Sequence, residues 1–325
     1  MRVLLLGATG LLGHNVLRRL MDEGHEVVAL VRRSDGIRLE KSGWETVTGS
    51  LLDYSTLEKA AEGCDAIINC AGTTDMSLRR YEDYLPVNRN LCGMRVRLMK
   101  SHGISILVHV STVNTIGYGT QGHPADESAP MRPPFKGSYY ADSKWEGERI
   151  ILSAATEGRH VVVVNPGYML GSYDFKPSSG KMLLAAYGRR LMLAPKGGKA
   201  FIHVDDVAQA MVAALSKGVN GSRYIVVNGD GMLTIKQLYE LQSSVCGYRQ
   251  KVLQCPDSLL KVLGRVGDVL RWMGAKTQVS SRNIRQLLVR EYYDNRHVLC
   301  DLRPEMTPIG KAIEDFYESR KRITI

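Results

Sequence analysis

Short apolar runs recur along the chain, and most are followed by a longer segment with helical spacing. The runs begin at Val3, Val27, Ala66, Ile104, Val161 and Tyr224. Uninterrupted apolar runs of this length are typical of parallel strands covered on both faces, because half-exposed strands alternate instead. Strands that alternate with helices imply right-handed crossovers. The pattern therefore predicts an α/β fold with a doubly wound parallel sheet.

The first run leads directly into a glycine-rich loop, Gly7-Ala8-Thr9-Gly10-Leu11-Leu12-Gly13. A helical pattern opens within this loop, and a second strand follows it. Glycines at this place let the backbone turn tightly and approach a pyrophosphate, while free N–H groups at the start of the helix face the anion. The loop predicts a dinucleotide site, with GxxGxxG spacing in place of the commoner GxGxxG.

Tyr140 and Lys144 lie four residues apart in a segment that continues as a helix, so both side chains share one helical face. A free tyrosine loses its proton only near pH 10. A neighbouring cation favours the phenolate and so makes the phenol a usable acid or base. The pair predicts proton-transfer chemistry, although Tyr and Lys also meet at this spacing on solvated helix faces.

Several segments resemble the extended short-chain dehydrogenase/reductases, which include nucleotide-sugar epimerases and dihydroflavonol reductases. The matching segments are GATGLLG at 7–13, the stretch around Asp53, LPVNRN at 85–90, VHVSTVNTIGYG at 108–119, YYADSKWEGE at 139–148, VVVVNPGYMLG at 161–171 and FIHVDDVAQAM at 201–211. The resemblance implies a Rossmann fold with Tyr140 as the catalytic acid or base. It also implies that Lys144 lowers the pKa of Tyr140 and holds the nicotinamide ribose. Thr112 or the adjacent Ser111 then hydrogen-bonds the substrate oxygen.

The loop and the resemblance together assign a set of residues to cofactor binding. Besides Tyr140 and Lys144, the set is Gly7, Thr9, Gly10, Leu11, Leu12, Gly13, Arg32, Leu52, Asp53, Ala71, Gly72, Asn88, Pro166 and Gly167. Asp53 resembles a position that contacts adenine, and it could equally cap a helix that begins near Ser55. Asn88 resembles an asparagine beside the site, and its plainer interpretation is a helix cap or a satisfied internal polar group.

Arg32 follows the second predicted strand, where enzymes that use NAD usually carry an acidic residue. A guanidinium at this place can form charge-assisted hydrogen bonds with a 2′-phosphate. The sequence therefore favours NADP. NAD stays open, because Arg32 could lie in a solvated turn and Asp35 could reach the ribose.

The apolar pattern loosens after Pro166 and partly returns after residue 200. We therefore expect residues 1–165 and 201–229 to form the dinucleotide-binding Rossmann domain. Residues 166–200 and 230–325 are expected to form a smaller, discontinuous substrate-binding domain. Within the latter, residues 259–273 form an apolar stripe at helical spacing that carries Lys261, Arg265 and Arg271. This stripe is either a substrate lid or a membrane-surface contact, or an ordinary amphipathic helix with solvated basic residues.

The 325-residue chain has 43 Lys and Arg against 33 Asp and Glu, a net charge of +10. Such a charge favours anionic partners, but no nucleic-acid-binding motif is present. No apolar segment of about 18 residues predicts a membrane span, and the first strand leaves no room for a signal peptide, so we expect a cytoplasmic protein. The six cysteines have no zinc-like spacing, which predicts no metal. A homodimer is an open alternative.

These features predict an NADPH-dependent reductase of a hydrophobic ketone or aldehyde of lipid, steroid or flavonoid type. In this hypothesis Tyr140 donates a proton to the oxygen while hydride reaches the carbonyl carbon. The alternative is a nucleotide-sugar epimerase or dehydratase with tightly bound NAD. A third hypothesis, a non-enzymatic NADPH sensor, is disfavoured because Tyr140 and Lys144 are both intact.

Overall fold

The computed structural model describes residues 1–33, 37, 43–156 and 158–321, so Asp35 lies outside the described residues. Its centre is a seven-stranded sheet with the order β10-β6-β5-β4-β1-β2-β3, in which all neighbouring strands run parallel. These strands are β1 (Arg2–Leu6), β2 (Glu26–Val31), β3 (Trp44–Thr48), β4 (Ala66–Asn69), β5 (Ile106–Val110), β6 (His160–Pro166) and β10 (Arg223–Val226). The predicted doubly wound parallel sheet is confirmed.

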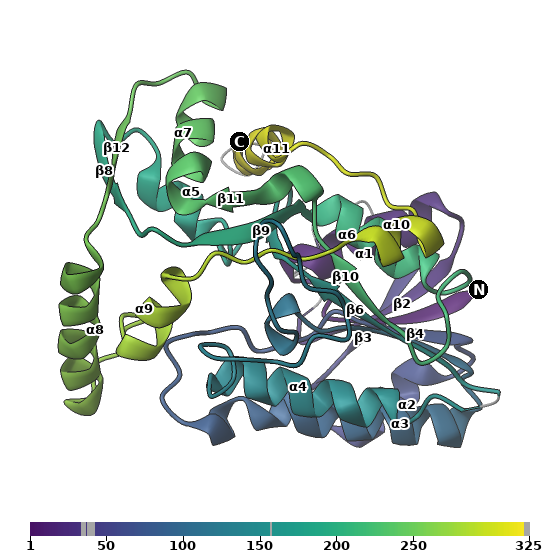
Figure 1. The fold of residues 1–325 in the computed structure, drawn as a ribbon. Helices are drawn as coiled ribbons and strands as arrows, with labels where there is room; N and C mark the ends of the chain where they lie inside the picture. Colours follow the sequence, from purple (N-terminus) through teal and green to yellow (C-terminus); the bar gives the residue numbers. More distant parts are fainter. Residues whose placement is uncertain (34–36, 38–42, 157, 322–325) are drawn as a thin grey trace.

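Helices cover both faces of this sheet (Figure 1). One face carries α1 (Leu11–Asp22) and α6 (Val204–Ala213), and the other carries α2 (Tyr54–Ala61), α3 (Leu91–His102) and α4 (Tyr139–Leu152). Strand β1 supplies both cores, because Val3 and Leu5 pack toward α1 and α6, while Leu4 and Leu6 pack on the opposite side. Alternation of side chains along a strand explains this division, and it explains why the strand reads as a continuous apolar run.

A smaller part of the molecule lies beside the carboxyl ends of these strands. It contains β7 (Tyr168–Leu170), β8 (Leu191–Ala194), β9 (Gly198–His203), β11 (Met232–Thr234), β12 (Lys251–Gln254), α5 (Lys181–Ala186), α7 (Ile235–Val245), α8 (Asp257–Trp272), α9 (Ser281–Leu287) and α11 (Ile309–Lys321). Strands β11, β9 and β7 form one small sheet, and β12 pairs with β8. The remaining helix, α10 (Arg296–Asp301), packs against β10 of the main sheet. The division into two discontinuous domains stays a prediction.

Two segments differ from the elements that the apolar pattern indicates. Strand β3 carries no apolar run, since its sequence is WETVT and its side chains are only partly covered at the edge of the sheet. The segment before α3 is a π-helical turn, Pro86–Asn90, and regular α-helix starts only at Leu91. This turn carries Asn88, which is buried.

Helix α8 exposes its apolar residues. Within it, only Gly264 and Gly267 are buried. A Cβ atom at Gly264 would lie 3.0 Å from the Ser281 Cα atom, and one at Gly267 would lie 2.3 Å from the Val279 carbonyl oxygen. Helix α8 therefore contacts the α9 segment through the side that carries these two glycines. The exposed apolar residues, which we call the α8 face, are Leu259, Val262, Leu263, Val266, Val269, Leu270, Trp272 and Met273. The helix stands apart at the margin of the molecule (Figure 1), and it is not an ordinary amphipathic helix packed on a core.

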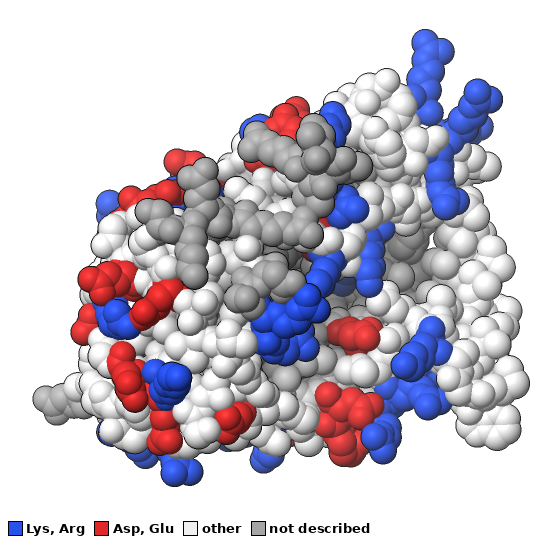
Figure 2. All heavy atoms as spheres, turned by 180° about the vertical axis from the view of Figure 1, so that it is seen from behind, with Lys and Arg blue, Asp and Glu red and all other residues white. Residues whose placement is uncertain are grey.

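Within the described residues, no helix is both long and apolar enough to span a bilayer. On the side of the molecule turned away in Figure 1, Lys and Arg side chains lie along the margin of a hollow near the centre, with a few acidic side chains among them (Figure 2).

Candidate active site

The loop between β1 and α1 is shaped by contacts that only glycine permits. Gly7 has a φ of +86°, and a Cβ atom there would lie 2.7 Å from the Ala71 backbone nitrogen. A Cβ atom at Gly13 would lie 2.1 Å from the Gly7 carbonyl oxygen, so no side chain fits between the loop and the helix. Gly10 donates its N–H to the same oxygen at 3.0 Å. These close approaches press the loop against the end of β4.

The first turn of α1 is suited to an anion. Gly10 is the N-cap residue and supplies no side-chain acceptor, and the turn holds no acidic residue. The N–H groups at the start of the helix therefore keep their partial positive charge available. Thr9 is exposed and Leu11 is half-buried beside these groups, whereas the Leu12 side chain packs into the core. The loop and the helix together fit the pyrophosphate of a dinucleotide.

Arg32, Leu52 and Asp53 follow neighbouring strands on the same edge. Arg32 directly follows β2 and is exposed, as is Leu52. Asp53 caps α2, since its carboxylate accepts the Ser55 N–H at 3.2 Å. Hydrogen bonds from the hydroxyls of Thr56 and Ser55 lower the pKa of Asp53. The capping role is thus observed, while contact with adenine stays a prediction.

Asn88 braces the loop that follows β4. Its Oδ1 atom accepts the Thr73 N–H at 2.8 Å, and its Nδ2 atom donates to the Thr73 carbonyl at 3.0 Å and to the Ser143 hydroxyl at 3.0 Å. The amide is buried and satisfied, in agreement with its plainer interpretation as an internal polar group. Its contacts tie the loop to α4. Gly72 precedes Thr73 in this loop, and a Cβ atom at Gly72 would lie 3.8 Å from the Lys144 Nζ atom.

Ala71 and Gly167 are placed by packing at the ends of β4 and β6. The Ala71 side chain is buried in the core beside α2 and α3, and its N–H donates to the Asn69 side chain at 3.1 Å. Pro166 is the last residue of β6. At Gly167, a Cβ atom would lie 2.1 Å from the Ala200 carbonyl oxygen, so glycine is required where the chain passes β9.

Tyr140 and Lys144 lie in the first turns of α4, next to the end of β5. Burial raises the pKa of Tyr140 to about 12, and a hydrogen bond with the Thr112 side chain acts in the opposite direction. Burial lowers the pKa of Lys144 to about 8. The Lys144 ammonium group donates to the Val110 carbonyl at 2.7 Å. The lowering of the Tyr140 pKa by Lys144, which the family resemblance implies, stays a prediction.

The two adjacent hydroxyls after β5 have different surroundings. Thr112 faces Tyr140, and its Oγ1 atom also accepts the Asn114 N–H at 3.3 Å. The Ser111 hydroxyl is buried, with no hydrogen-bond partner among the described residues. The Ser111 hydroxyl is therefore enclosed by the protein, whereas the Thr112 hydroxyl lies next to Tyr140.

A buried polar network that the sequence did not indicate supports the Thr112 turn. The Asn165 side chain donates to the Thr112 carbonyl at 3.2 Å and to Glu148 at 2.9 Å. Glu148 also accepts the Thr115 hydroxyl at 2.9 Å and pairs with Arg223 at 2.7 Å. All of these residues except Arg223 lie in segments that carry the family resemblance, but their joint role depends on three strands and a helix meeting in space.

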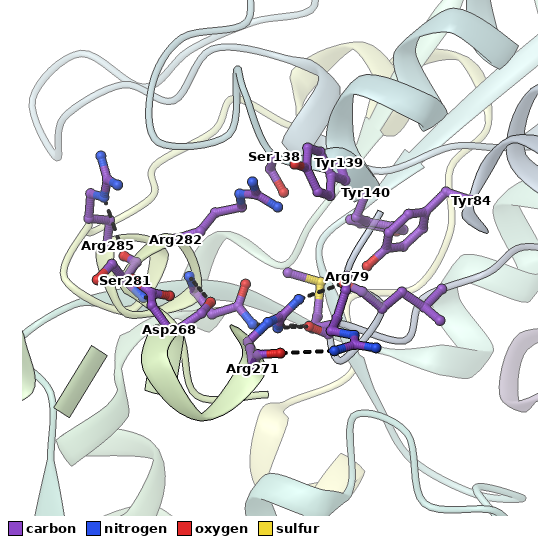
Figure 3. A pocket seen from close by; sticks show the side chains of 14 residues that line it. Arg79, Tyr84, Ser138, Tyr139, Tyr140, Asp268, Arg271, Ser281, Arg282 and Arg285 are labelled. Carbon is purple, nitrogen blue, oxygen red and sulfur yellow. Dashed lines mark hydrogen bonds between the residues drawn. The ribbon is translucent and has the colours of Figure 1, made fainter. Parts of the chain in front are cut away.

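A pocket of about 300 Å³ opens beside Tyr140 (Figure 3). Its lining comes from the loop after β4, the start of α4, the end of α8 and α9. The lining residues are Met76, Leu78, Arg79, Tyr84, Ser138, Tyr139, Tyr140, Asp268, Arg271, Ser280, Ser281, Arg282, Asn283 and Arg285. Apart from Tyr140, none of these was indicated by the sequence as part of the site, except that Arg271 lies in the predicted stripe. Among the described residues, no group of three or more His, Cys, Asp or Glu side chains could hold a metal ion.

Comparisons with known proteins agree with this arrangement. Residues 3–228 match the model of the NAD dependent epimerase/dehydratase family. Sterol demethylase protein B of Methylococcus capsulatus is 30% identical over 275 residues, which cover 83% of this chain and 82% of that protein. A putative dihydroflavonol 4-reductase of Synechocystis sp. is 28% identical over 320 residues, which cover 95% and 91%.

The fold is also that of solved structures. A UDP-glucose 4-epimerase of Stenotrophomonas maltophilia, solved with bound NAD, superimposes with a TM-score of 0.79 at 17% identity, covering 100% of this chain and 99% of that one. The segment that matches the family model, residues 3–228, contains the glycine loop, the Tyr140 site and the strands of the main sheet. The protein belongs to the NAD dependent epimerase/dehydratase family and is an NAD(P)-dependent oxidoreductase with a Rossmann fold.

Proposed function

We propose that the protein reduces the carbonyl group of a hydrophobic ketone or aldehyde with NADPH, and that Tyr140 donates the proton to the carbonyl oxygen. The observation that carries this proposal is the placement of Tyr140 at a pocket, beside the Thr112 side chain and on the sheet edge that holds the glycine loop. A phenol held beside a hydroxyl at a cavity can act on a carbonyl oxygen within that cavity.

Tyr140 has the protonation state that a reductase requires. Because burial raises its pKa to about 12, the phenol carries its proton at neutral pH and is a donor at the start of reduction. The Thr112 hydroxyl orients the substrate's carbonyl oxygen, to which Tyr140 donates its proton. The Lys144 ammonium, fixed on the Val110 carbonyl, supplies a positive charge next to the helix face that carries Tyr140. A bound nicotinamide dinucleotide would supply the hydride.

The residues that would hold the dinucleotide are those that the sequence assigned. The glycine loop and the first turn of α1 would bind the pyrophosphate, and Lys144 would bind the nicotinamide ribose. Asp53, Leu52 and the loop ending at Gly72 would line the adenine side and the approach to the ribose. Arg32 would pair with a 2′-phosphate, which favours NADP over NAD.

The substrate class follows from two considerations. Most of the pocket's lining is polar, but Met76, Leu78 and three tyrosines border it and carry apolar atoms that a ring or an alkyl chain could contact. The curated relatives are named for a sterol and a dihydroflavonol, both of which are hydrophobic ring compounds. These names support a lipid, steroid or flavonoid carbonyl as the substrate.

The test is oxidation of NADPH across a panel of steroid, flavonoid and long-chain ketones and aldehydes. We expect turnover with at least one member, and a loss of about a hundredfold or more in kcat for Tyr140→Phe with cofactor affinity unchanged. Arg32→Glu should weaken binding of NADPH but leave NADH affinity within about twofold. No turnover with any member, or full activity of Tyr140→Phe, would overturn the proposal.

An epimerase or dehydratase is the second candidate, because the chain matches a UDP-glucose 4-epimerase along its whole length. Such an enzyme returns the hydride and keeps its cofactor. Mass spectrometry of the purified, denatured protein separates the two. Stoichiometric NAD released from the protein would support the epimerase, whereas a protein that gains NADPH only on addition would support the reductase.

We also propose that the protein works in the cytoplasm and that the α8 face rests on an anionic membrane surface. Seven apolar side chains of α8 and that of Met273, which caps its C-terminus, are each at least 41% exposed, and Lys261 and Arg265 are exposed beside them. Basic residues that flank an exposed apolar face suit acidic lipid headgroups, and the net charge of +10 has the same sign. A substrate dissolved in the bilayer could then reach the pocket, which α8 borders through Asp268 and Arg271. A homodimer that covers the face is the alternative occupant.

A further inference from the structure

The pocket beside Tyr140 is strongly basic. Four arginines line it, and its acidic lining is Asp268 alone. The carboxylate of Asp268 accepts the Ser281 N–H at 3.0 Å and forms no ion pair with an arginine of the described residues. An uncharged ketone has no need of such a lining, so the distribution of these arginines calls for an explanation.

Two of the arginines are engaged in holding the pocket together. Arg271 donates to the carbonyl oxygens of Leu78 at 2.6 Å, Thr277 at 3.1 Å and Met76 at 3.2 Å. Arg79 donates to the Arg271 carbonyl at 2.9 Å. Figure 3 shows this pair below the cavity, joined by dashed lines. The hydrogen bonds of these two guanidinium groups connect the loop after β4 to the end of α8.

Arg282 is differently placed. It stands on α9 and its side chain extends toward Ser138 and Tyr139, whereas Arg285 points away from them (Figure 3). The Arg282 guanidinium carbon lies 3.6 Å from the centre of the Tyr139 ring. A guanidinium stacked on a ring keeps its N–H groups at the edge, in the plane where they can bind a carboxylate through two hydrogen bonds.

The Arg282 guanidinium forms no ion pair with a carboxylate of the described residues, and the residue is only partly exposed. Arg282 acts electrostatically on Asp142, whose pKa is raised by burial and lowered by the Gly137 N–H and by Arg282. The Asp142 carboxylate accepts the Gly137 N–H at 3.1 Å and does not pair with the guanidinium. A cation held in a pocket without a counter-ion is stabilised by any anion that enters.

We propose that the substrate carries a carboxylate as well as the carbonyl group, and that Arg282 binds this carboxylate while the carbonyl oxygen meets Tyr140. This inference rests on the proposed function and narrows it to a keto acid with an apolar body. Arg282 stacks on Tyr139, and both residues line the same pocket as Tyr140, so the acid-binding cation and the proton donor border one cavity. Arg282 is then a residue that determines specificity.

The experiment compares each long-chain or ring ketone of the panel as the free acid and as its methyl ester, with NADPH oxidation as the readout. The wild-type protein should favour the acid in kcat/KM by roughly tenfold or more, because a charge-assisted, two-point contact is lost in the ester. In Arg282→Gln the ratio of acid to ester should fall to about one, through KM more than kcat. Arg282→Lys should keep part of the preference.

Arg97→Gln is the matched control, because Arg97 is also stacked on a tyrosine, with 4.2 Å from its guanidinium carbon to the Tyr54 ring centre, but lies outside the pocket. It should keep the wild-type ratio. Equal turnover of acid and ester by the wild type, or an unchanged ratio in a folded Arg282→Gln, would overturn this inference alone. Absence of turnover for both forms of every ketone would overturn the proposed function. Conversion of UDP-glucose without added cofactor would overturn both.

Discussion

Thr112 and Ser111 are adjacent, and their hydroxyls are expected to contribute differently to catalysis. The Thr112 hydroxyl lies beside Tyr140, while that of Ser111 is buried without a partner among the described residues. We expect Thr112→Val to lower kcat/KM by tenfold to about a hundredfold, because the substrate oxygen loses an orienting donor. Ser111→Ala should cost less than about threefold. Steady-state kinetics of the two variants checks this, and the reverse order would assign the role to Ser111.

The Lys144 ammonium group is buried, and burial disfavours its charged form. Its pKa falls from 10.5 to about 8, so between these pH values the unfolded chain binds a proton that the folded chain lacks. The stability contribution of Lys144 therefore rises as pH increases from about 8 to 10.5, and the charged form is costly below pH 8. We expect Lys144→Met to be more stable than the wild type at pH 7, by an order of about 1–3 kcal/mol, and inactive.

Urea unfolding at pH 7 and at pH 9.5 measures this effect. The stability advantage of Lys144→Met should shrink at the higher pH, because the wild-type side chain is then neutral in the folded protein. An advantage that is equal at both pH values, or a variant that is less stable at pH 7, would show that the hydrogen bond to Val110 outweighs desolvation.

At the scale of single elements, the sequence predicts the helix α8 but leaves open what its apolar side contacts. Helical spacing of apolar residues between 259 and 273 predicts a helix, and one is present at Asp257–Trp272. The same spacing usually means that the apolar side is packed. Here two glycines make the contact with the α9 segment instead, so the apolar side faces outward.

The membrane proposal gives a direct test of this element. The wild-type protein should sediment with vesicles that contain phosphatidylglycerol, and less with vesicles of phosphatidylcholine alone or at high salt. The double change Val262→Ser and Val266→Ser should weaken partitioning roughly tenfold, because two exposed apolar side chains no longer enter the lipid.

Val219→Ser is the control for the vesicle experiment, since Val219 is 53% exposed but lies outside α8. No sedimentation of the wild type with acidic vesicles would end the proposal. So would a wild-type dimer, measured by light scattering, that the double change dissociates, because a second copy would then occupy the face.

At the scale of the whole molecule, Arg271 joins two regions that are distant in the chain. Its guanidinium binds the loop after β4 at carbonyl oxygens 195 and 193 residues away. We expect Arg271→Ala to loosen this loop, raise KM several-fold and speed tryptic cleavage after Arg79 or Arg80, because about two to three hydrogen bonds to a charged donor are lost. Arg265→Ala, a change to an exposed arginine on the same helix, should leave the cleavage rate unaltered.

Mass spectrometry of brief tryptic digests measures the cleavage, and titration of the substrate gives KM. If both variants are cut at the wild-type rate, Arg271 does not hold the loop. If cleavage speeds up while KM is unchanged, the loop is held but takes no part in binding the substrate.

The sequence by itself determined those features that depend on neighbouring residues. Apolar runs define the buried strands of the main sheet, the glycine loop follows from local backbone needs, and four-residue spacing puts Tyr140 and Lys144 on one face of α4. The edge strand β3 escaped prediction because a partly covered strand needs no apolar run. Local spacing carries this information because strand and helix periods are properties of the backbone.

The tertiary structure alone decided which hydroxyl faces Tyr140, which side of α8 is packed, and which arginines are already bound. Arg282 shows the difference, since a lone arginine between Ser281 and Asn283 gives no signal in the sequence. It becomes a candidate ligand only when folding brings α9 against the start of α4, more than a hundred residues earlier in the chain. The charge of a pocket depends on partners that come from several segments, and chain order does not specify which of them meet.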